Sequence, residues 1–184
     1  MEAAQVKAFE ASEEASVPKP APGEAIAVTG PNGSGKTTAL RALLRSDGTA
    51  YAPQILPSGA RMRVEDLVML GRTRRLSAWS RPSSEDAACV VRAMEAMGIS
   101  HLRRRWTDEL SGGELQRAVV AMALAQEAPV LLLDEPASHQ DAAGEKAVWK
   151  AVADAKARGC GVVVALHGAL PEGLFDRIVR LSPM

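Results

Sequence analysis

The sequence has few aromatic residues, few cysteines and no excess of charge of either sign. Aromatic side chains make up 3% of the 184 residues, so we expect a core built mainly of Ala, Val, Leu and Met. The 22 basic residues are balanced by 22 acidic ones, which gives no electrostatic reason to expect a nucleic-acid partner. Cys89 and Cys160 form neither a CxxC motif nor a Cys/His cluster, so we interpret them as reduced thiols of a cytosolic protein.

Long hydrophobic runs are also missing. The longest, Ala118–Ala125 and Gly161–Leu166, fall well short of the ~18 residues that a membrane-spanning helix needs. The acidic N-terminal stretch lacks the apolar core of a secretory signal. Any function at a membrane would therefore require a partner protein.

The apolar pattern predicts an α/β fold with a mostly parallel sheet flanked by helices. We predict strands at Ala25–Thr29, Val130–Leu133, Gly161–Leu166 and Arg177–Leu181, and helices at Lys36–Arg45, Val64–Leu70, Ser84–Met97, Ser100–Arg105, Gly113–Gln126 and Glu145–Arg158. Ser84 is the expected N-cap of its helix and Gly98 the expected stop. The length favours one domain, in which residues 1–57 and 110–184 form the core and about 58–109 an inserted helical subdomain.

Residues 30–38, GPNGSGKTT, fit the phosphate-loop pattern G-x-x-x-x-G-K-[ST] between a predicted strand and a predicted helix. The glycines let backbone N–H groups approach phosphate oxygens, and the helix N-terminus adds a favourable dipole. Lys36 would neutralise the β- and γ-phosphates, and the Thr37 hydroxyl would bind Mg²⁺. The order strand, loop, helix disfavours the alternative of a glycine-rich turn that matches by chance.

The run VLLLDEP at 130–136 places two carboxylates after a wholly apolar strand. Asp134 would hold Mg²⁺ through water, and Glu135 would polarise the attacking water as a general base. Ligands of open α/β sheets bind at the carboxyl ends of strands, where both motifs fall. The two motifs together indicate a P-loop nucleoside triphosphatase.

A third motif, LSGGELQR at 110–117, narrows the family. Ser111 and two glycines at a helix N-terminus can form an anion site, whereas the alternative is an ordinary helix start with Ser111 as N-cap. With the motifs in this order, residues 24–168 resemble the ATP-binding-cassette (ABC) ATPases. The resemblance implies that ATP binds between two cassettes, and that the signature residues contact the γ-phosphate held by the opposite one.

The resemblance also implies roles for single residues. Gln54 would sense Mg²⁺ and the attacking water, Asp141 would cross the dimer interface, and His167 would contact the γ-phosphate. Alternatives are an ordinary loop amide, a helix-capping carboxylate and a structural histidine. The implied catalytic set is Glu135, His167, Gln54 and Lys36; the metal set is Thr37, Gln54 and Asp134; the nucleotide set is Gly30, Asn32, Gly33, Ser34, Gly35, Lys36, Thr37, Thr38, Ser111, Gly112, Gly113, Glu114 and Asp141.

The sequence departs from the family pattern in several places. Only 18 residues separate Lys36 from Gln54, so the usual antiparallel β-subdomain must be reduced. Phe9 is the only aromatic before the phosphate loop, and its spacing does not suit adenine stacking. Gln140 stands where an apolar residue is usual, and Met122 replaces a common Arg.

By resemblance, the chain would be the ATPase subunit of a transporter. Stretches such as VEDLVMLGRTRR (64–75) are similar to importer cassettes for iron-siderophore, haem and cobalamin, and the short insert before Gln54 to zinc and manganese cassettes. The implied partners are a second, head-to-tail cassette, a membrane permease and a solute-binding protein, with the chain on the inner face of the cell membrane. Alternatives are an exporter ATPase, a soluble ABC ATPase such as an iron–sulfur assembly subunit, and a non-hydrolysing nucleotide-binding module.

A cluster of arginines in the middle section has two interpretations. Arg72, Arg74, Arg75 and Arg81 could form a solvated basic face, or could contact an acidic coupling loop or lipid headgroups.

Overall fold

The computed structural model describes residues 7–10, 17–44, 48–54, 61–75 and 81–183. These residues form two compact units. Unit 1 comprises residues 1–51, 129–135 and 152–184, and unit 2 comprises residues 52–128 and 136–151. The predicted subdomain 58–109 lies within unit 2, which also contains the signature motif; its boundaries stay a prediction.

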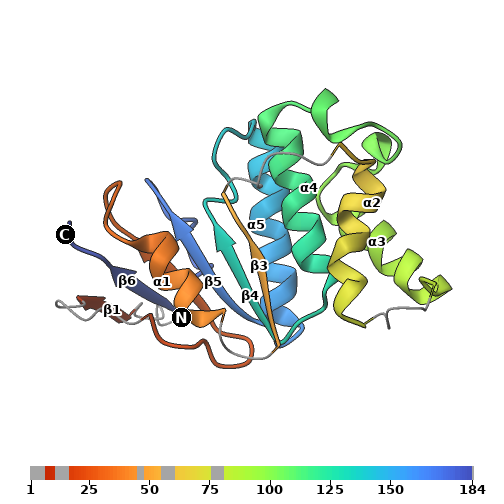
Figure 1. The fold of residues 1–184 in the computed structure, drawn as a ribbon. Helices are drawn as coiled ribbons and strands as arrows, with labels where there is room; N and C mark the ends of the chain where they lie inside the picture. The colour runs from red at the N-terminus through yellow and green to blue at the C-terminus, as the bar shows by residue number, and fades with distance from the viewer. Residues whose placement is uncertain (1–6, 11–16, 45–47, 55–60, 76–80, 184) are drawn as a thin grey trace. The chain divides into compact units, whose positions relative to one another are not determined.

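Unit 1 is built on a six-stranded sheet in the order β1-β6-β2-β5-β4-β3. The strands are β1 (Lys7–Glu10), β2 (Ala25–Thr29), β3 (Thr49–Ala52), β4 (Val130–Asp134), β5 (Gly161–Leu166) and β6 (Arg177–Arg180). The pairs β1–β6, β6–β2, β2–β5 and β5–β4 are all parallel (Figure 1). The predicted α/β fold with a mostly parallel sheet is confirmed.

The register of the central strands determines where their loops meet. Thr29 at the end of β2 pairs with Leu166, the last residue of β5. Asp134 at the end of β4 pairs with Ala165, one residue earlier on β5. Parallel strands that end level with one another deliver their following loops to the same edge of the sheet. The loops that begin at residues 30, 135 and 167 therefore lie together.

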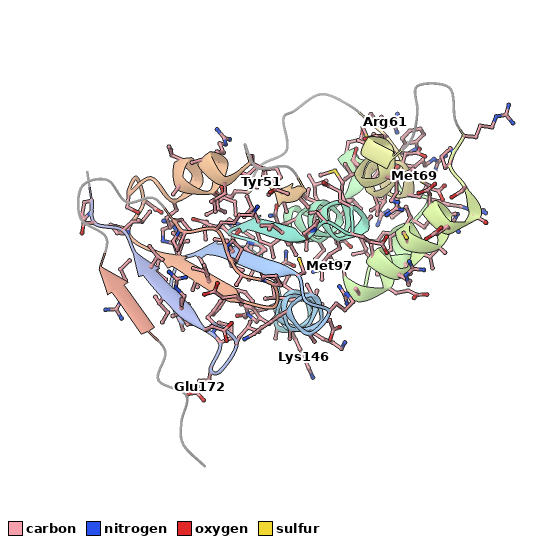
Figure 2. The ribbon with its side chains drawn as sticks, turned by 90° about the horizontal axis from the view of Figure 1, so that it is seen from below. Tyr51, Arg61, Met69, Met97, Lys146 and Glu172 are labelled. Carbon is pink, nitrogen blue, oxygen red and sulfur yellow. The ribbon has the colours of Figure 1, made fainter. Side chains whose placement is uncertain are left out.

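Apolar side chains of the sheet and of helix α1 (Lys36–Leu43) form the core of unit 1. Leu40 of α1 is fully buried against a cluster that includes Ile26, Leu132 and Val163. Tyr51 of β3 packs against the same cluster and is labelled in Figure 2. Residues 152–157 of α5 (Ala142–Ala157) cover the face of the sheet opposite α1 (Figure 2).

Unit 2 is helical, and its other helices pack around α4 (Gly112–Ala125), the helix that begins in the signature motif. Helices α2 (Val64–Met69) and α3 (Ser84–Ala96) both pack against α4 (Figure 1). Short 3₁₀ turns η1 (Leu70–Arg75), η2 (Ser100–Leu102) and η3 (Thr107–Glu109) connect the helices. Among the described residues, no helix combines the length and apolarity needed to cross a bilayer.

The observed secondary structure differs from the predicted one at a helix cap, a short turn and a short strand. Ser83, not Ser84, is the N-cap of α3, because its hydroxyl accepts the N–H of Asp86 while the Asp86 carboxylate accepts the N–H of Ser83. Gly98 ends this helix as predicted, with a φ of +65°. The predicted helix Ser100–Arg105 is only the single turn η2. Strand β3 was not predicted, because its four residues are too short for periodicity to show.

Arg72 contradicts both interpretations of the arginine cluster, because its side chain is only 3% exposed. Its guanidinium donates to Asp86 (2.8 Å), to Glu127 (3.0 Å) and to the carbonyl oxygen of Ala125 (2.7 Å). It therefore joins η1, α3 and the end of α4 from inside unit 2. Arg81 is exposed, whereas the side chains of Arg74 and Arg75 lie outside the described part of the chain.

Candidate functional site

The loop between β2 and α1 is shaped by glycine. A Cβ on Gly30 would lie 2.6 Å from the Leu181 carbonyl oxygen and 2.5 Å from Ser34 Oγ, so only glycine fits. Gly35 is the N-cap of α1 in the left-handed conformation, with φ 83°. Because glycine has no side chain to cap the helix, the first N–H groups of α1 are left for another acceptor. Asn32 and Gly33 are exposed on this loop, and Thr38 is exposed in the first turn of α1.

A buried hydroxyl in the loop fits an anionic ligand. Ser34 is 6% exposed, and its Oγ has no hydrogen-bond partner among the described residues. Buried polar atoms are nearly always paired in folded proteins. A phosphate oxygen held by the loop would supply the acceptor, so this atom supports the phosphate-binding interpretation.

Lys36 is buried at the start of α1, and its ammonium group is held in place. Lys36 is 6% exposed, and its Nζ donates to the carbonyl oxygens of Gly30 (2.9 Å) and Pro31 (3.0 Å). Its third contact is Nε2 of His167, at 2.9 Å. The predicted lysine and histidine therefore meet, although 131 residues separate them.

Thr37 and Asp134 lie side by side, where hard oxygen ligands are needed. Thr37 Oγ1 donates to Asp134 Oδ2 at 2.7 Å, and Asp134 is 2% exposed. No group of three or more His, Cys, Asp or Glu side chains in the described residues is arranged to hold a metal. A hydroxyl and one carboxylate suit Mg²⁺, which keeps several waters and binds substrate phosphates in sites of this kind. The residues present therefore fit magnesium.

Tyr51 is a member of this cluster that sequence analysis missed. Its hydroxyl donates to the same Asp134 oxygen, at 3.2 Å. Burial, and then the neighbouring Asp134 charge, raise the pKa of Tyr51 above its ordinary value. The available signal was a single polar aromatic in the stretch YAPQ, three residues before Gln54.

Glu135 leaves β4 with an unusual backbone. Its φ is +50°, and its N–H donates to the Ala165 carbonyl oxygen at 2.9 Å. A non-glycine residue in this region costs about 1 kcal/mol or more and occurs often at functional sites. The turn brings Oε1 of Glu135 to 2.7 Å from Nε2 of His167, while the Glu135 side chain stays 15% exposed.

The remaining predicted site residues belong to unit 2. Ser111 is the N-cap of α4, and a capping box pairs it with Glu114. Hydrogen bonds from the Ser111 backbone and hydroxyl hold the pKa of Glu114 below its ordinary value. A hollow of about 280 Å³ is lined by Gln54, Gly112, Leu115, Gln116, Val119, Ser138 and His139. Gln54 and Asp141 are exposed.

The structure thus gathers Lys36, Thr37, Asp134, Glu135 and His167 at one sheet edge of unit 1, whereas Gln54, Asp141 and residues 111–114 are in unit 2. The family described as ABC transporter matches residues 19–138. The chain belongs to the ABC transporter family. The expected resemblance to the nucleotide-binding subunits of metal and metal-chelate importers is also confirmed, as follows.

Relatives of this ABC chain are named for the transport of metals or metal chelates. A manganese transport system ATP-binding protein of Halalkalibacterium halodurans is 32% identical, over 88% of this chain and 73% of the relative. A zinc import ATP-binding protein of Chelativorans sp. is 38% identical, over 79% of this chain and 53% of the relative. A metal-chelate type ABC transporter in an inward-facing conformation superposes with a TM-score of 0.69, at 31% identity, over 79% of this chain and 62% of that one.

Between Lys36 and Gln54, the antiparallel β-subdomain that is usual in the ABC family was expected to be reduced. In the described part of that stretch, α1 is followed by the single strand β3. Phe9, the only aromatic before the phosphate loop, lies in β1, and its side chain is outside the described part.

Proposed function

We propose that this chain binds Mg-ATP and hydrolyses it as the ATPase subunit of an ABC importer for a metal or a metal chelate. The observation that carries the proposal is that His167 contacts both Lys36 (2.9 Å) and Glu135 (2.7 Å) beside the phosphate-binding loop. The manganese and zinc relatives support the class of cargo.

The site residues of unit 1 would have separate roles in phosphoryl transfer. The N–H groups at the start of α1 and the Lys36 ammonium would bind the β- and γ-phosphates. Thr37 and Asp134 would hold Mg²⁺, which neutralises charge that develops on the phosphate oxygens. Glu135 would accept a proton from the attacking water, and His167 would orient the Glu135 carboxylate and contact the γ-phosphate.

The residues of unit 2 would act on a second cassette. Ser111, Gly112, Gly113 and Glu114 form a helix N-terminus that can face an anion. Asp141 is exposed and lies 3.7 Å from Arg117 of the same helix. In the proposed head-to-tail homodimer they would complete the ATP site of the partner. Gln54 would sense the Mg²⁺ and water. We also propose residues 58–109 as the helical subdomain that receives a permease at the cytoplasmic face of the membrane, with a solute-binding protein outside it.

The proposal is tested with the Glu135→Gln variant, which keeps the side chain's size but cannot accept the proton. Saturating Mg-ATP should convert this variant into a stable dimer, measured by sedimentation. A protein that binds ATP yet stays monomeric in the presence of its membrane partner would contradict the sandwich.

The cargo is tested by purifying tagged Glu135→Gln protein from native membranes with Mg-ATP and identifying what accompanies it. A polytopic permease with a solute-binding protein is the expected result. Recovery of soluble partners alone, from membranes shown to contain intact complexes, would favour the soluble ABC ATPases instead.

A further inference from the structure

The side chain of Gln140 joins the segment before α5 to the start of α4. Its Nε2 donates to the Gly113 carbonyl oxygen at 3.0 Å. Its Oε1 accepts from Nη1 of Arg117 at 2.6 Å. Both ends of the amide are therefore used, and one of the two bonds is assisted by charge, which makes it stronger than a neutral hydrogen bond.

Arg117 extends this tie to Asp141. Its Nη1 lies 3.7 Å from Oδ1 of Asp141, and the Arg117 side chain is only 15% exposed. The same Asp141 oxygen accepts the N–H of Gly144 at 2.8 Å and so caps the first turn of α5. The Asp141 side chain is 75% exposed, which leaves it able to meet another molecule.

Two glycines show how closely these segments pack. A Cβ on Gly113 would lie 2.9 Å from the carbonyl oxygen of His139. A Cβ on Gly144 would lie 2.3 Å from Nη1 of Arg117 and 2.5 Å from Oε1 of Gln140. A side chain at residue 113 would press on the backbone of residue 139, and one at residue 144 would displace the Arg117 and Gln140 side chains that form the tie.

We propose that Gln140 is a positioning residue that fastens Asp141 to the N-terminus of α4, so that Asp141 and residues 111–114 meet a second cassette as one rigid surface. The inference rests on the proposed ATP-driven dimer. An apolar side chain at residue 140 could fill the space, but it would leave the Gly113 oxygen and the Arg117 guanidinium without this partner. Ordering both elements in advance lowers the entropic cost of closing the dimer.

The test compares Gln140→Met with the parent, both in the Glu135→Gln background. Methionine is unbranched and similar in length, but it lacks the amide donor and acceptor. We expect ATP affinity of the dilute monomer to change less than about twofold, whereas the Mg-ATP dimer should weaken at least about tenfold, because the bond from a charged donor is lost. Hydrogen exchange at residues 112–116 and 142–145 should become faster.

Matched variants separate positioning from folding. Gln126→Leu, at the other end of α4, should leave the dimer unchanged. Gln140→Glu keeps an acceptor for Arg117 but cannot donate to Gly113, so its dimer should be of intermediate strength. If Gln140→Met fails to fold, as judged by circular dichroism, Gln140→Glu alone decides the comparison.

Two results would overturn the inference. The first is a Gln140→Met dimer as tight as the parent dimer. The second is unchanged hydrogen exchange in residues 112–116. If the parent itself does not dimerise even with its membrane partner present, the proposed function fails instead, and the exchange measurement alone decides whether Gln140 holds the two segments together.

Discussion

Nε2 of His167 lies 2.7 Å from Oε1 of Glu135, and the same nitrogen lies 2.9 Å from Nζ of Lys36. A neutral imidazole nitrogen either donates or accepts, so it cannot serve both neighbours in these ways at once. Lys36 already donates to two backbone carbonyl oxygens. We therefore interpret the contact with Glu135 as the one that carries the His167 proton, which would orient the carboxylate.

Replacement of His167 by Ala should lower ATP hydrolysis by about 10²-fold or more, because the Glu135 carboxylate would lose its orienting donor. ATP affinity should change much less, since Lys36 and the phosphate loop remain. Steady-state hydrolysis and equilibrium binding of a fluorescent ATP analogue measure the two effects. His167→Gln, which keeps a donor, is the control and should retain more activity; equal hydrolysis in the wild type and the Ala variant would contradict this role.

Replacement of Lys36 by Ala should weaken nucleotide binding by at least about tenfold, because a buried charge-assisted contact with the phosphates is lost. Titration calorimetry with ATP measures the loss. Lys146→Ala, an exposed lysine in α5, serves as the control. Unchanged ATP affinity in the Lys36 variant would show that this residue does not bind the phosphates.

Removal of the Tyr51 hydroxyl tests its contact with Asp134. Tyr51→Phe keeps the packing against the core but deletes one hydrogen bond, a change of about 1 kcal/mol. We expect the Mg²⁺ affinity of the ADP complex to fall a few-fold, by about that energy, with Mn²⁺ binding followed by electron paramagnetic resonance as the readout. Metal affinity equal to that of the wild type would show that the hydroxyl only packs.

Acid should destabilise unit 2 through Asp86. Hydrogen bonds from Ser83, and then Arg72, lower the pKa of Asp86 to about 2, from 3.8 in a free side chain. Because the folded pKa is depressed, this stabilisation is complete above pH 3.8 and is lost as the pH falls toward 2. The free energy of unfolding in urea should therefore fall more steeply over this pH range for the wild type than for Asp86→Asn. Parallel curves for the two proteins would contradict the assignment.

Loss of Arg72 should be more damaging than loss of an exposed arginine. Arg72→Met would leave Asp86 and the Ala125 carbonyl oxygen buried without their partner, at a cost of about 3–5 kcal/mol. Chemical unfolding measures this change, and Arg81→Met provides the exposed control, for which we expect a change within about 0.5 kcal/mol. Similar stability of the two variants would argue against a structural ion pair at Arg72.

Much of the fold could be predicted because its signals are local. The runs AIAVT, VLLLD and GVVVAL are apolar throughout and form the buried strands β2, β4 and β5. The Ser111 cap at the start of α4 and the Gly98 stop at the end of α3 are also local features of the sequence. Strand β3 and the true cap at Ser83 were missed, because four residues show no period and adjacent serines offer the same chemistry.

The sequence by itself determined the phosphate-binding loop, the signature helix and the strands that carry the carboxylates, since each depends on residues within about ten positions of one another along a helix or strand. Only the tertiary structure decided that His167 reaches both Lys36 and Glu135, that Tyr51 joins Asp134, that Arg72 is buried, and that Gln140 ties Asp141 to the signature helix. These contacts depend on strand register and on helix packing between distant segments, and neither is written in the local pattern of residues.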